Sequence, residues 1–218
     1  MIYEYPPPAD PIRQGDIFVG LPRADISLRR VPILAADGKQ LEAPWEEIAK
    51  DGQAVTAVLA LRPVAAIVAS QDCDTTHGID VTLCEIQRFP LVEPRGKDVT
   101  SPHTWTKIIT QHARVNQKWF YLPPDEKIGF VEKMAVDFRV TLRVLRTDLE
   151  ELRSLRKGRL CPVADEHFRE RIAEFFRRYP YDEWYPLNRE ELETYKKHHP
   201  DARPFPWQET LPPPSDIR

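Results

Sequence analysis

The segment "VAAIVASQDCDTTHG", Val64 to Gly78, joins an almost unbroken apolar run to a cluster of polar residues. The run is short and rich in Val, Ala and Ile, so it predicts a strand over Val64–Ser70. The next segment, "IDVTLCEIQRF", alternates, with Val81, Leu83 and Glu85 on one face and Thr82, Cys84 and Ile86 on the other. With "DTTHG" as the turn, the two segments predict a β-hairpin.

Other elements are predicted on both sides of this hairpin. The expected strands cover Ile17–Leu21, which Pro22 stops, Ala24–Leu34, Val55–Leu61, Gln117–Leu122, Ile128–Met134 and Val136–Leu145. The expected helices cover Pro44–Gly52, Thr104–Val115, Asp165–Tyr179 with Asp165 as the N-cap, and Arg189–His199. The order predicts an α+β protein in which a small, strongly bent β-sheet or barrel comes first and helices pack on it.

Composition narrows the class of protein. The 218 residues carry a formal charge of −3, which argues neither for nor against a nucleic-acid partner. No apolar stretch approaches the roughly 20 residues that span a bilayer, and the acidic, proline-rich N-terminus is not a secretory signal. Three dispersed cysteines do not form a disulfide framework. We therefore expect a cytoplasmic protein without a membrane partner.

Four segments together resemble the layout of PemK/MazF-type toxins: "RQGDIFVGLP", "LRPVAAIVAS", "VTLCEIQ" and "AVDFRVTLRVL". The resemblance implies an SH3-like barrel that cuts single-stranded RNA without a metal or other cofactor, and it allows a homodimer. It covers residues 13–152, with insertions at about 29–54 and 90–122. Outside that range, proline content and helical spacing predict a proline-rich arm at residues 1–12, helices that pack on the barrel at 153–199, and a proline-rich tail at 200–218.

The resemblance assigns residues to the site. Arg62, in "LRPVAAIV", matches the catalytic arginine of the family, a role in which a guanidinium stabilises charge on a scissile phosphate. The expected Thr or Ser falls at Gln87–Arg88, where there is no hydroxyl, and Arg88 is the candidate for phosphate affinity instead. Asp137 is a candidate general base, with pairing to a nearby arginine as the alternative.

The chain also resembles a group of bacterial proteins without an established activity. The shared patterns are "QGDI", "SQ-x-CD" and a late helix "R-x-R-I/L-A-x-F-F-x-R". These patterns imply no chemistry by themselves.

The cluster Gln71, Asp72, Cys73 and Asp74 is predicted to fix a turn beside a binding groove, with the aspartates bonded to turn amides. A cysteine nucleophile is an alternative, although neighbouring carboxylates raise a thiol pKa. A metal site is a second alternative, and it would draw on Cys73, Cys84, His77 and His103. No Cys-x-x-Cys spacing supports it.

The only local basic run, "RSLRKGRL", contains Arg153, Arg156, Lys157 and Arg159 and suits contact with phosphates. A solvated helix end is the other interpretation of this run. Trp119 is a candidate for stacking on exposed bases, whereas a strand with an aromatic core face would explain "KWFYL" equally well.

Two functions therefore remain open from the sequence, with a cysteine-centred metal protein as a weaker third. The first is an RNA-handling, PemK/MazF-like domain that is a possible endoribonuclease. The second is a non-catalytic protein-interaction module of a bacterial defence or toxin–antitoxin system, in which the 165–179 helix docks a protein partner.

Overall fold

The computed structural model describes residues 2–35, 37–52, 54–97, 99–115, 118–176, 184–185, 189–198, 200 and 203–204. The chain divides into two compact units, Met1–Phe176 and Arg177–Arg218, and each is described by itself. The second unit contains the strands β10 (Trp184–Tyr185) and β11 (Arg203–Pro204), which pair in parallel, and the helix α7 (Arg189–Lys196). The predicted helix at Arg189–His199 is therefore present, although His199 lies outside the described residues.

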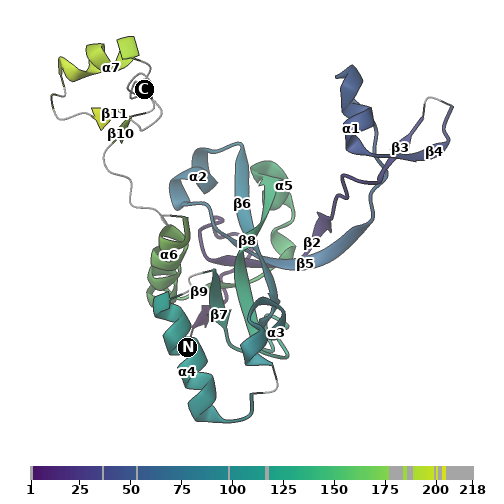
Figure 1. Cartoon of the computed structure of the whole chain (residues 1–218). Helices are drawn as coiled ribbons and strands as arrows, with labels where there is room; N and C mark the ends of the chain where they lie inside the picture. The colour runs from purple at the N-terminus through teal and green to yellow at the C-terminus, as the bar shows by residue number, and fades with distance from the viewer. Residues whose placement is uncertain are drawn as a thin grey trace, which may run out of the picture. The chain divides into compact units, whose positions relative to one another are not determined.

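The first unit is built on a seven-stranded antiparallel sheet with the order β1-β9-β2-β5-β6-β8-β7 (Figure 1). Its strands are β1 (Tyr3–Glu4), β2 (Asp16–Ala24), β5 (Leu61–Val68), β6 (Asp80–Arg88), β7 (Trp119–Leu122), β8 (Met134–Leu145) and β9 (Arg156–Leu160). The predicted α+β class and the predicted pairing of β5 with β6 are confirmed. Among the described residues β1 and β7 remain edges, so main-chain pairing does not close a barrel.

Side chains connect these two edges. The hydroxyl of Tyr3, on β1, donates to the carbonyl of Pro123, just beyond β7, at 2.8 Å. The Tyr3 ring packs edge-on against Phe130, and both belong to the core that β7 also lines. The sheet is thus bent far enough to bring its first and last strands together without a ladder between them.

Both faces of β5 are buried, which explains its unbroken apolar run. Ile67 belongs to the core under the helix α6, together with Cys84 and Ile86 of β6. Val64, Ala66 and Val68 point the other way, into a second core with Val81 and Leu83 of β6. The predicted division of β6 into two faces is confirmed for these apolar side chains. We call the two sides the α6 face and the opposite face.

The connection between β5 and β6 differs from the predicted turn. It is a short helix, α2 (Asp72–His77), in which Thr75 is buried and its hydroxyl donates to the carbonyl of Asp72. The threonine hydroxyl satisfies a carbonyl that a hairpin turn would have left to water. The polar residues "DCDTTH" therefore form a helix that rises from the end of the strand.

Four of the predicted strand segments differ from the structure. Pro22 does not stop β2, because beyond Leu21 the strand pairs only with β5, so a missing N–H removes no ladder bond to a third strand. In the predicted strand Ala24–Leu34, Ala24 ends β2 and Val31–Leu34 forms β3, while Val55–Leu61 contributes one isolated bridge, at Ala57, before β5 begins at Leu61. Ile128–Met134 is mostly a turn anchored by Asp125, and β8 begins at Met134.

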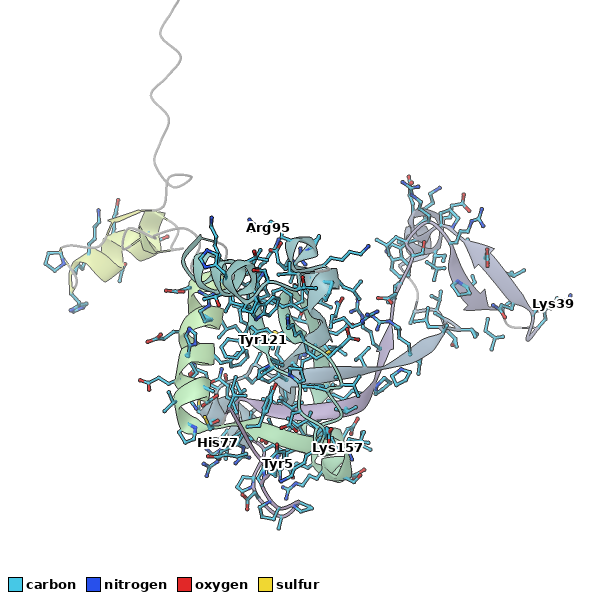
Figure 2. The ribbon with its side chains drawn as sticks, turned by 90° about the horizontal axis from the view of Figure 1, so that it is seen from below. Tyr5, Lys39, His77, Arg95, Tyr121 and Lys157 are labelled. Carbon is cyan, nitrogen blue, oxygen red and sulfur yellow. The ribbon has the colours of Figure 1, made fainter. Side chains whose placement is uncertain are left out.

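Residues between β2 and β5 form an arm at the far end of the β2–β5 ribbon (Figure 1). The arm contains the hairpin β3 and β4 (Gln40–Ala43), the helix α1 (Trp45–Ile48) and a 3-10 turn (Ala49–Asp51). The turn ends at Gly52, whose φ of +61° is the left-handed conformation common at helix C-termini. Figure 2 places Lys39 at the tip of the hairpin, away from the part of the unit that carries Tyr121.

Helices cover the remaining surfaces. α6 (Pro162–Phe176) packs Phe168 and Ile172 into the core of the α6 face, and it begins three residues before the predicted N-cap, Asp165. Positions 177–179 of the predicted helix lie outside the described residues. The predicted helix at Thr104–Val115 is confirmed as α4 (Pro102–Val115). Short helical segments complete the unit, at Phe89–Val92 (α3), Pro94–Gly96, Arg146–Glu151 (α5) and Arg153–Leu155.

Candidate functional site

A cluster of arginines and carboxylates lies where the β2–β5 ribbon leaves the sheet. Its centre is Glu85 of β6, whose side chain is only 3% exposed. Arg62, from the start of β5, donates to Glu85 at 3.1 Å, and Arg23, from the end of β2, also forms an ion pair with Glu85. The strand register explains these contacts. Arg23 of β2 lies opposite Arg62 of β5, and Glu85 of β6 lies opposite Ala66, which is also on β5.

The two guanidiniums are much more accessible than the carboxylate between them. Arg62 is 48% exposed and Arg23 is 22% exposed. Both also contact a second carboxylate, Asp25, which is 60% exposed: the Arg23–Asp25 distance is 2.7 Å and the Arg62–Asp25 distance is 3.2 Å. The hydrogen bond from Arg62 is the main reason that the pKa of Asp25 is lowered. We call Arg23, Asp25, Arg62 and Glu85 the Glu85 cluster.

Asp137 extends this cluster across the sheet. It is the register partner of Glu85 on β8, it is buried, and Arg139 binds both of its carboxylate oxygens, at 2.8 and 2.7 Å. Like charges directly opposite each other on neighbouring strands repel, so each buried carboxylate needs its own cation. The predicted pairing of Asp137 with a nearby arginine is present, and that arginine is Arg139. The structure also places Asp137 beside Glu85, which contacts Arg62.

A large β-bulge produces this arrangement. Between the pairs Cys84↔Thr141 and Glu85↔Asp137, β6 advances by one residue while β8 advances by four. The extra residues include Phe138, whose N–H donates to the carbonyl of Lys118 beside β7. Bulges of this kind change the direction of side chains and are frequent beside functional sites.

Arg88 lies apart from the Glu85 cluster. It follows Glu85 by three residues on β6, and it pairs with Glu132 at 2.6 Å, where both side chains are well exposed. The structure therefore brings Arg62 and Asp137 together with Glu85 between them, but it gives Arg88 a separate partner.

A groove of about 780 Å³ opens on the α6 face, between α2 and α6. Gln71, Asp72 and Cys73 line one side, and Arg169, Ile172 and Phe176 line the other. The predicted proximity of this cluster to a groove thus agrees with the geometry, with a helix in place of the turn. The Glu85 cluster projects from the opposite face, since Glu85 pairs with Ala66, so the groove and the cluster are separate sites.

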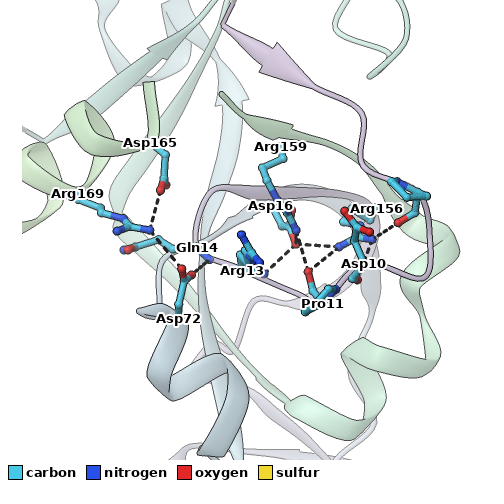
Figure 3. A network of polar contacts seen from close by, with 11 residues as sticks. Asp10, Pro11, Arg13, Gln14, Asp16, Asp72, Arg156, Arg159, Asp165 and Arg169 are labelled. Atoms are coloured by element: carbon cyan, nitrogen blue, oxygen red, sulfur yellow. Dashed lines mark hydrogen bonds and ion pairs between the residues drawn. The ribbon is translucent and has the colours of Figure 1, made fainter. Parts of the chain in front are cut away.

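The segments "QGDI", "SQDCD" and the helix that begins at Pro162 meet at this groove. The main-chain N–H of Gln14 donates to Asp72 at 2.9 Å, and Arg169 lies between Asp72 (3.4 Å) and Asp165 (2.8 Å) (Figure 3). Burial is the main cause of the raised pKa of Asp165, one of whose carboxylate oxygens has no hydrogen-bond partner among the described residues. Gly15 must be glycine here, because its φ is +83° and a Cβ would meet Asp165 at 2.7 Å.

Most of the basic run holds the N-terminal segment in place. Arg156 is 1% exposed, pairs with Asp16 at 3.1 Å, and donates to the carbonyls of Pro7, Asp10 and Pro11. Arg159 binds both oxygens of the same Asp16 (Figure 3). A buried guanidinium with these partners is not available to a phosphate, so the structure does not support phosphate contact by Arg156.

The other members of the run also have protein partners. Arg153 donates to the carbonyl of Ala9, and exposed Lys157 donates to the carbonyl of Ser154. Trp119 is 2% exposed and packs edge-on against Phe89, with Trp105 and Tyr121 around the same ring. Trp119 therefore belongs to an aromatic core face, as the alternative interpretation of "KWFYL" predicted. In this position it does not stack on a base.

The cysteines and histidines do not converge. Cys73 is exposed at the groove, while Cys84 is buried in the core, where burial raises its pKa to about 12. His77 and His103 are exposed on α2 and α4. Over the described residues, the structure contains no group of three or more His, Cys, Asp and Glu side chains arranged to hold a metal ion. Nor does any helix there have the length and apolar character needed to cross a membrane.

Sequence reasoning missed Arg23, Asp25 and Glu85 as site residues. One signal was available: Glu85 interrupts the apolar side of β6, at a position where the alternation calls for a buried residue. A charge at such a position needs a buried partner. Which partner it has depends on a pairing register that local patterns do not contain.

No family model, curated protein or solved structure matches this chain.

Proposed function

We propose that this chain is a PemK/MazF-like, SH3-barrel-derived protein that binds single-stranded RNA at the Glu85 cluster and cleaves it as a metal-independent endoribonuclease. The observation that carries the proposal is the burial of Glu85 beneath two accessible guanidiniums. A buried carboxylate fixes Arg23 and Arg62 in direction while leaving their outer N–H groups to an anion. The four segments that carry the resemblance in the sequence form β2, β5, β6 and β8, which are successive neighbours in one sheet.

The chemistry assigns a role to each group. Arg23 and Arg62 bind the scissile phosphate and stabilise the charge that develops on it, and Glu85 positions them. Arg139 turns from Asp137 to the phosphate, and Asp137 accepts the proton of the attacking 2′-hydroxyl. The bond from phosphorus to the 5′-oxygen breaks, and that oxygen takes a proton from water. The hydroxide so formed takes the proton from Asp137, and the products are a 2′,3′-cyclic phosphate and a 5′-hydroxyl. The hydroxyl missing at Gln87–Arg88 is not required by this scheme.

The test is incubation of the protein with mixed single-stranded RNA in EDTA, beside the variants Arg62→Ala and Asp137→Asn. We expect each variant to cleave about 10² to 10³ times more slowly, as for the loss of a charge-stabilising or proton-accepting group. Arg143→Ala is the matched control. Arg143 lies on β8 and, like Arg62, is an exposed arginine in an ion pair. Equal cleavage by Arg62→Ala and Arg143→Ala, or no cleavage by the folded wild-type protein, would reject the ribonuclease.

A second candidate function, a protein-interaction module, is favoured by the arm rather than by α6. On α6 the aromatic Phe168 is buried and Phe175 packs on the core, which leaves Phe176 exposed at the end of the helix. On the arm and at its base, large apolar side chains are exposed to 41–66%: Ile26, Leu28, Leu34, Leu41, Trp45, Val55, Val58 and Leu61. Exposed apolar groups gathered in this way are typical of interaction surfaces.

We assign a second copy of the chain to this surface. β4 pairs with β3 alone among the described strands, so its outer edge offers open main-chain groups to an identical strand. The arm also carries both signs of charge, as Lys39 and Glu42 on and beside β4 illustrate. Light scattering should give a dimer mass for the wild-type protein and a monomer mass for Leu41→Glu. A monomeric wild-type protein at tens of micromolar would reject this second candidate.

A further inference from the structure

The exposed carboxylate of Asp25 lies in front of the two guanidiniums of the Glu85 cluster. It accepts from Arg23 at 2.7 Å and from Arg62 at 3.2 Å. Glu85 contacts the same two side chains from the buried side. Each guanidinium thus has one carboxylate behind it in the protein interior and shares a second one at the surface.

The two carboxylates differ in how firmly they are held. Glu85 lies in the middle of β6, paired on both sides by β5 and β8, and is 3% exposed. Asp25 follows β2, whose last residue is Ala24, and is 60% exposed at the base of the arm. The buried carboxylate is part of the sheet, whereas the exposed one needs only a side-chain rotation to leave the guanidiniums.

We propose that Asp25 occupies the place of a substrate phosphate and acts as an internal competitor for it. This inference rests on the proposed function, since it describes how the same arginines receive an RNA phosphodiester. The N–H groups that now point at Asp25 are in a position to bind two oxygens of a phosphate, the arrangement that arginine favours. A phosphodiester must displace the Asp25 carboxylate before it binds, so Asp25 lowers the affinity of the free protein for RNA.

The chemical class of the ligand follows from the exposed groups. Two guanidiniums held a short distance apart favour a tetrahedral anion with several charged oxygens. Asp25 itself repels any anion that does not displace it. Free phosphate and the backbone of a nucleic acid share this chemistry, and a longer strand would gain from further contacts with Arg139, which is 47% exposed.

The test measures binding without cleavage. A fluorescent 2′-O-methyl RNA oligonucleotide lacks the attacking hydroxyl, so fluorescence anisotropy reports affinity alone. We expect Asp25→Asn to bind it about five to ten times more tightly than the wild-type protein. Asp37→Asn is the matched control, because Asp37 is another exposed aspartate of the arm, it pairs with Lys39, and its replacement removes the same charge. Its affinity should stay within about twofold.

A second comparison ties the gain to the guanidiniums. In an Arg62→Ala background, Asp25→Asn should raise the affinity for the oligonucleotide by less than about twofold, because one of the two guanidiniums that it frees has been removed. Inorganic phosphate should compete with the oligonucleotide at lower concentration for Asp25→Asn than for the wild-type protein. If phosphate alone shows this gain and the oligonucleotide does not, the site binds free phosphate, and the RNA version of the proposal fails.

The outcomes separate this inference from the ribonuclease. Tighter binding by Asp25→Asn without cleavage by any variant supports the phosphate position and rejects the enzyme. Cleavage that depends on Arg62, with Asp25→Asn binding no more tightly than Asp37→Asn, supports the enzyme and rejects the competitor. Weaker binding by Asp25→Asn also rejects it, since it would show that Asp25 supports the site. Asp25→Ser repeats each comparison, and thermal unfolding confirms that the variants are folded.

Discussion

Two networks of arginines and carboxylates lie in the same unit and differ in their exposure to water. One is the Glu85 cluster, and the other, which we call the Asp16 network, contains Asp16, Arg156 and Arg159. In the Asp16 network every group is withdrawn from water: Asp16 is 0%, Arg156 1% and Arg159 12% exposed. In the Glu85 cluster only the central carboxylate is buried, and Arg62 is 48% exposed. The first network has its remaining N–H groups on main-chain carbonyls of the N-terminal segment. The second has them on an exposed carboxylate.

The comparison shows what distinguishes a structural charge network from a candidate site. A buried, fully satisfied network is costly to disturb and has nothing left to offer a ligand. A network with a buried anchor and exposed cations keeps its geometry while it exchanges its outer partner. The density of basic residues in the sequence does not tell these cases apart, because the richest basic run supplies the structural network.

The largest expected effect is on the Asp16 network. Asp16→Asn removes the charge that two arginines share and leaves them in a buried position without compensation. We expect a loss of about 3–5 kcal/mol in the free energy of unfolding, measured by urea denaturation. Asp37→Asn, an exposed aspartate, should change it by less than about 0.5 kcal/mol. A loss below about 1 kcal/mol for Asp16→Asn would mean that the two networks do not differ as described.

A smaller effect is expected for Arg156→Lys, which keeps the charge near Asp16. Lysine has three donors on one nitrogen and cannot reach the carbonyls of Pro7, Asp10 and Pro11 as the guanidinium does. We expect a loss of about 1–3 kcal/mol in stability and faster proteolysis within residues 2–12. Lys157→Arg is the control, since Lys157 is exposed and donates to the carbonyl of Ser154, outside the N-terminal segment. Unchanged cleavage of the N-terminal segment would show that other contacts hold it.

Glu85→Gln sharpens the comparison, because it is the equivalent change in the other network. In this variant the guanidiniums of Arg23 and Arg62 still contact water and Asp25. These contacts partly compensate for the loss of the Glu85 charge. We expect a loss of about 1–2 kcal/mol in the free energy of unfolding, between the values for exposed and buried pairs. Urea denaturation beside Asp16→Asn provides the measurement. A loss as large as that of Asp16→Asn would make the Glu85 cluster structural rather than exchangeable.

The smallest effect concerns Asp165, whose pKa is raised, mainly by burial. As pH rises through the unfolded and then the folded pKa, the unfolded state loses its proton first, and the native state loses stability. Asp165→Asn does not titrate at this position. We therefore expect its stability relative to wild type to be higher at pH 7 than at pH 3, as measured by denaturation at both values. A relative stability that falls with pH would show that the Arg169 pair outweighs burial.

Much of the fold could be predicted from local patterns. Periodicity alone reveals which faces of an element are buried. Three examples are the apolar run of β5, the alternation of β6, and the helical spacing of Phe168 and Ile172. The errors occurred where a local rule met a tertiary exception. Pro22 continues a strand because the ribbon there has free edges, and Asp72–His77 forms a helix in a segment whose composition also suits a turn.

The candidate site depended far more on the tertiary structure. The sequence by itself marked Arg62 through the resemblance to PemK/MazF-type toxins, Asp137 as a candidate general base, and Gln71–Asp74 as the polar cluster that ends an apolar strand. It did not mark Glu85 as the anchor or Asp25 as the exposed partner, and it ranked the basic run of residues 153–159 above both. Residues 23, 62, 85 and 137 meet only through the register of three strand pairs and the bulge in β8. Local periodicity records which side chains are buried, whereas the pairing of charges is decided by which strands lie side by side.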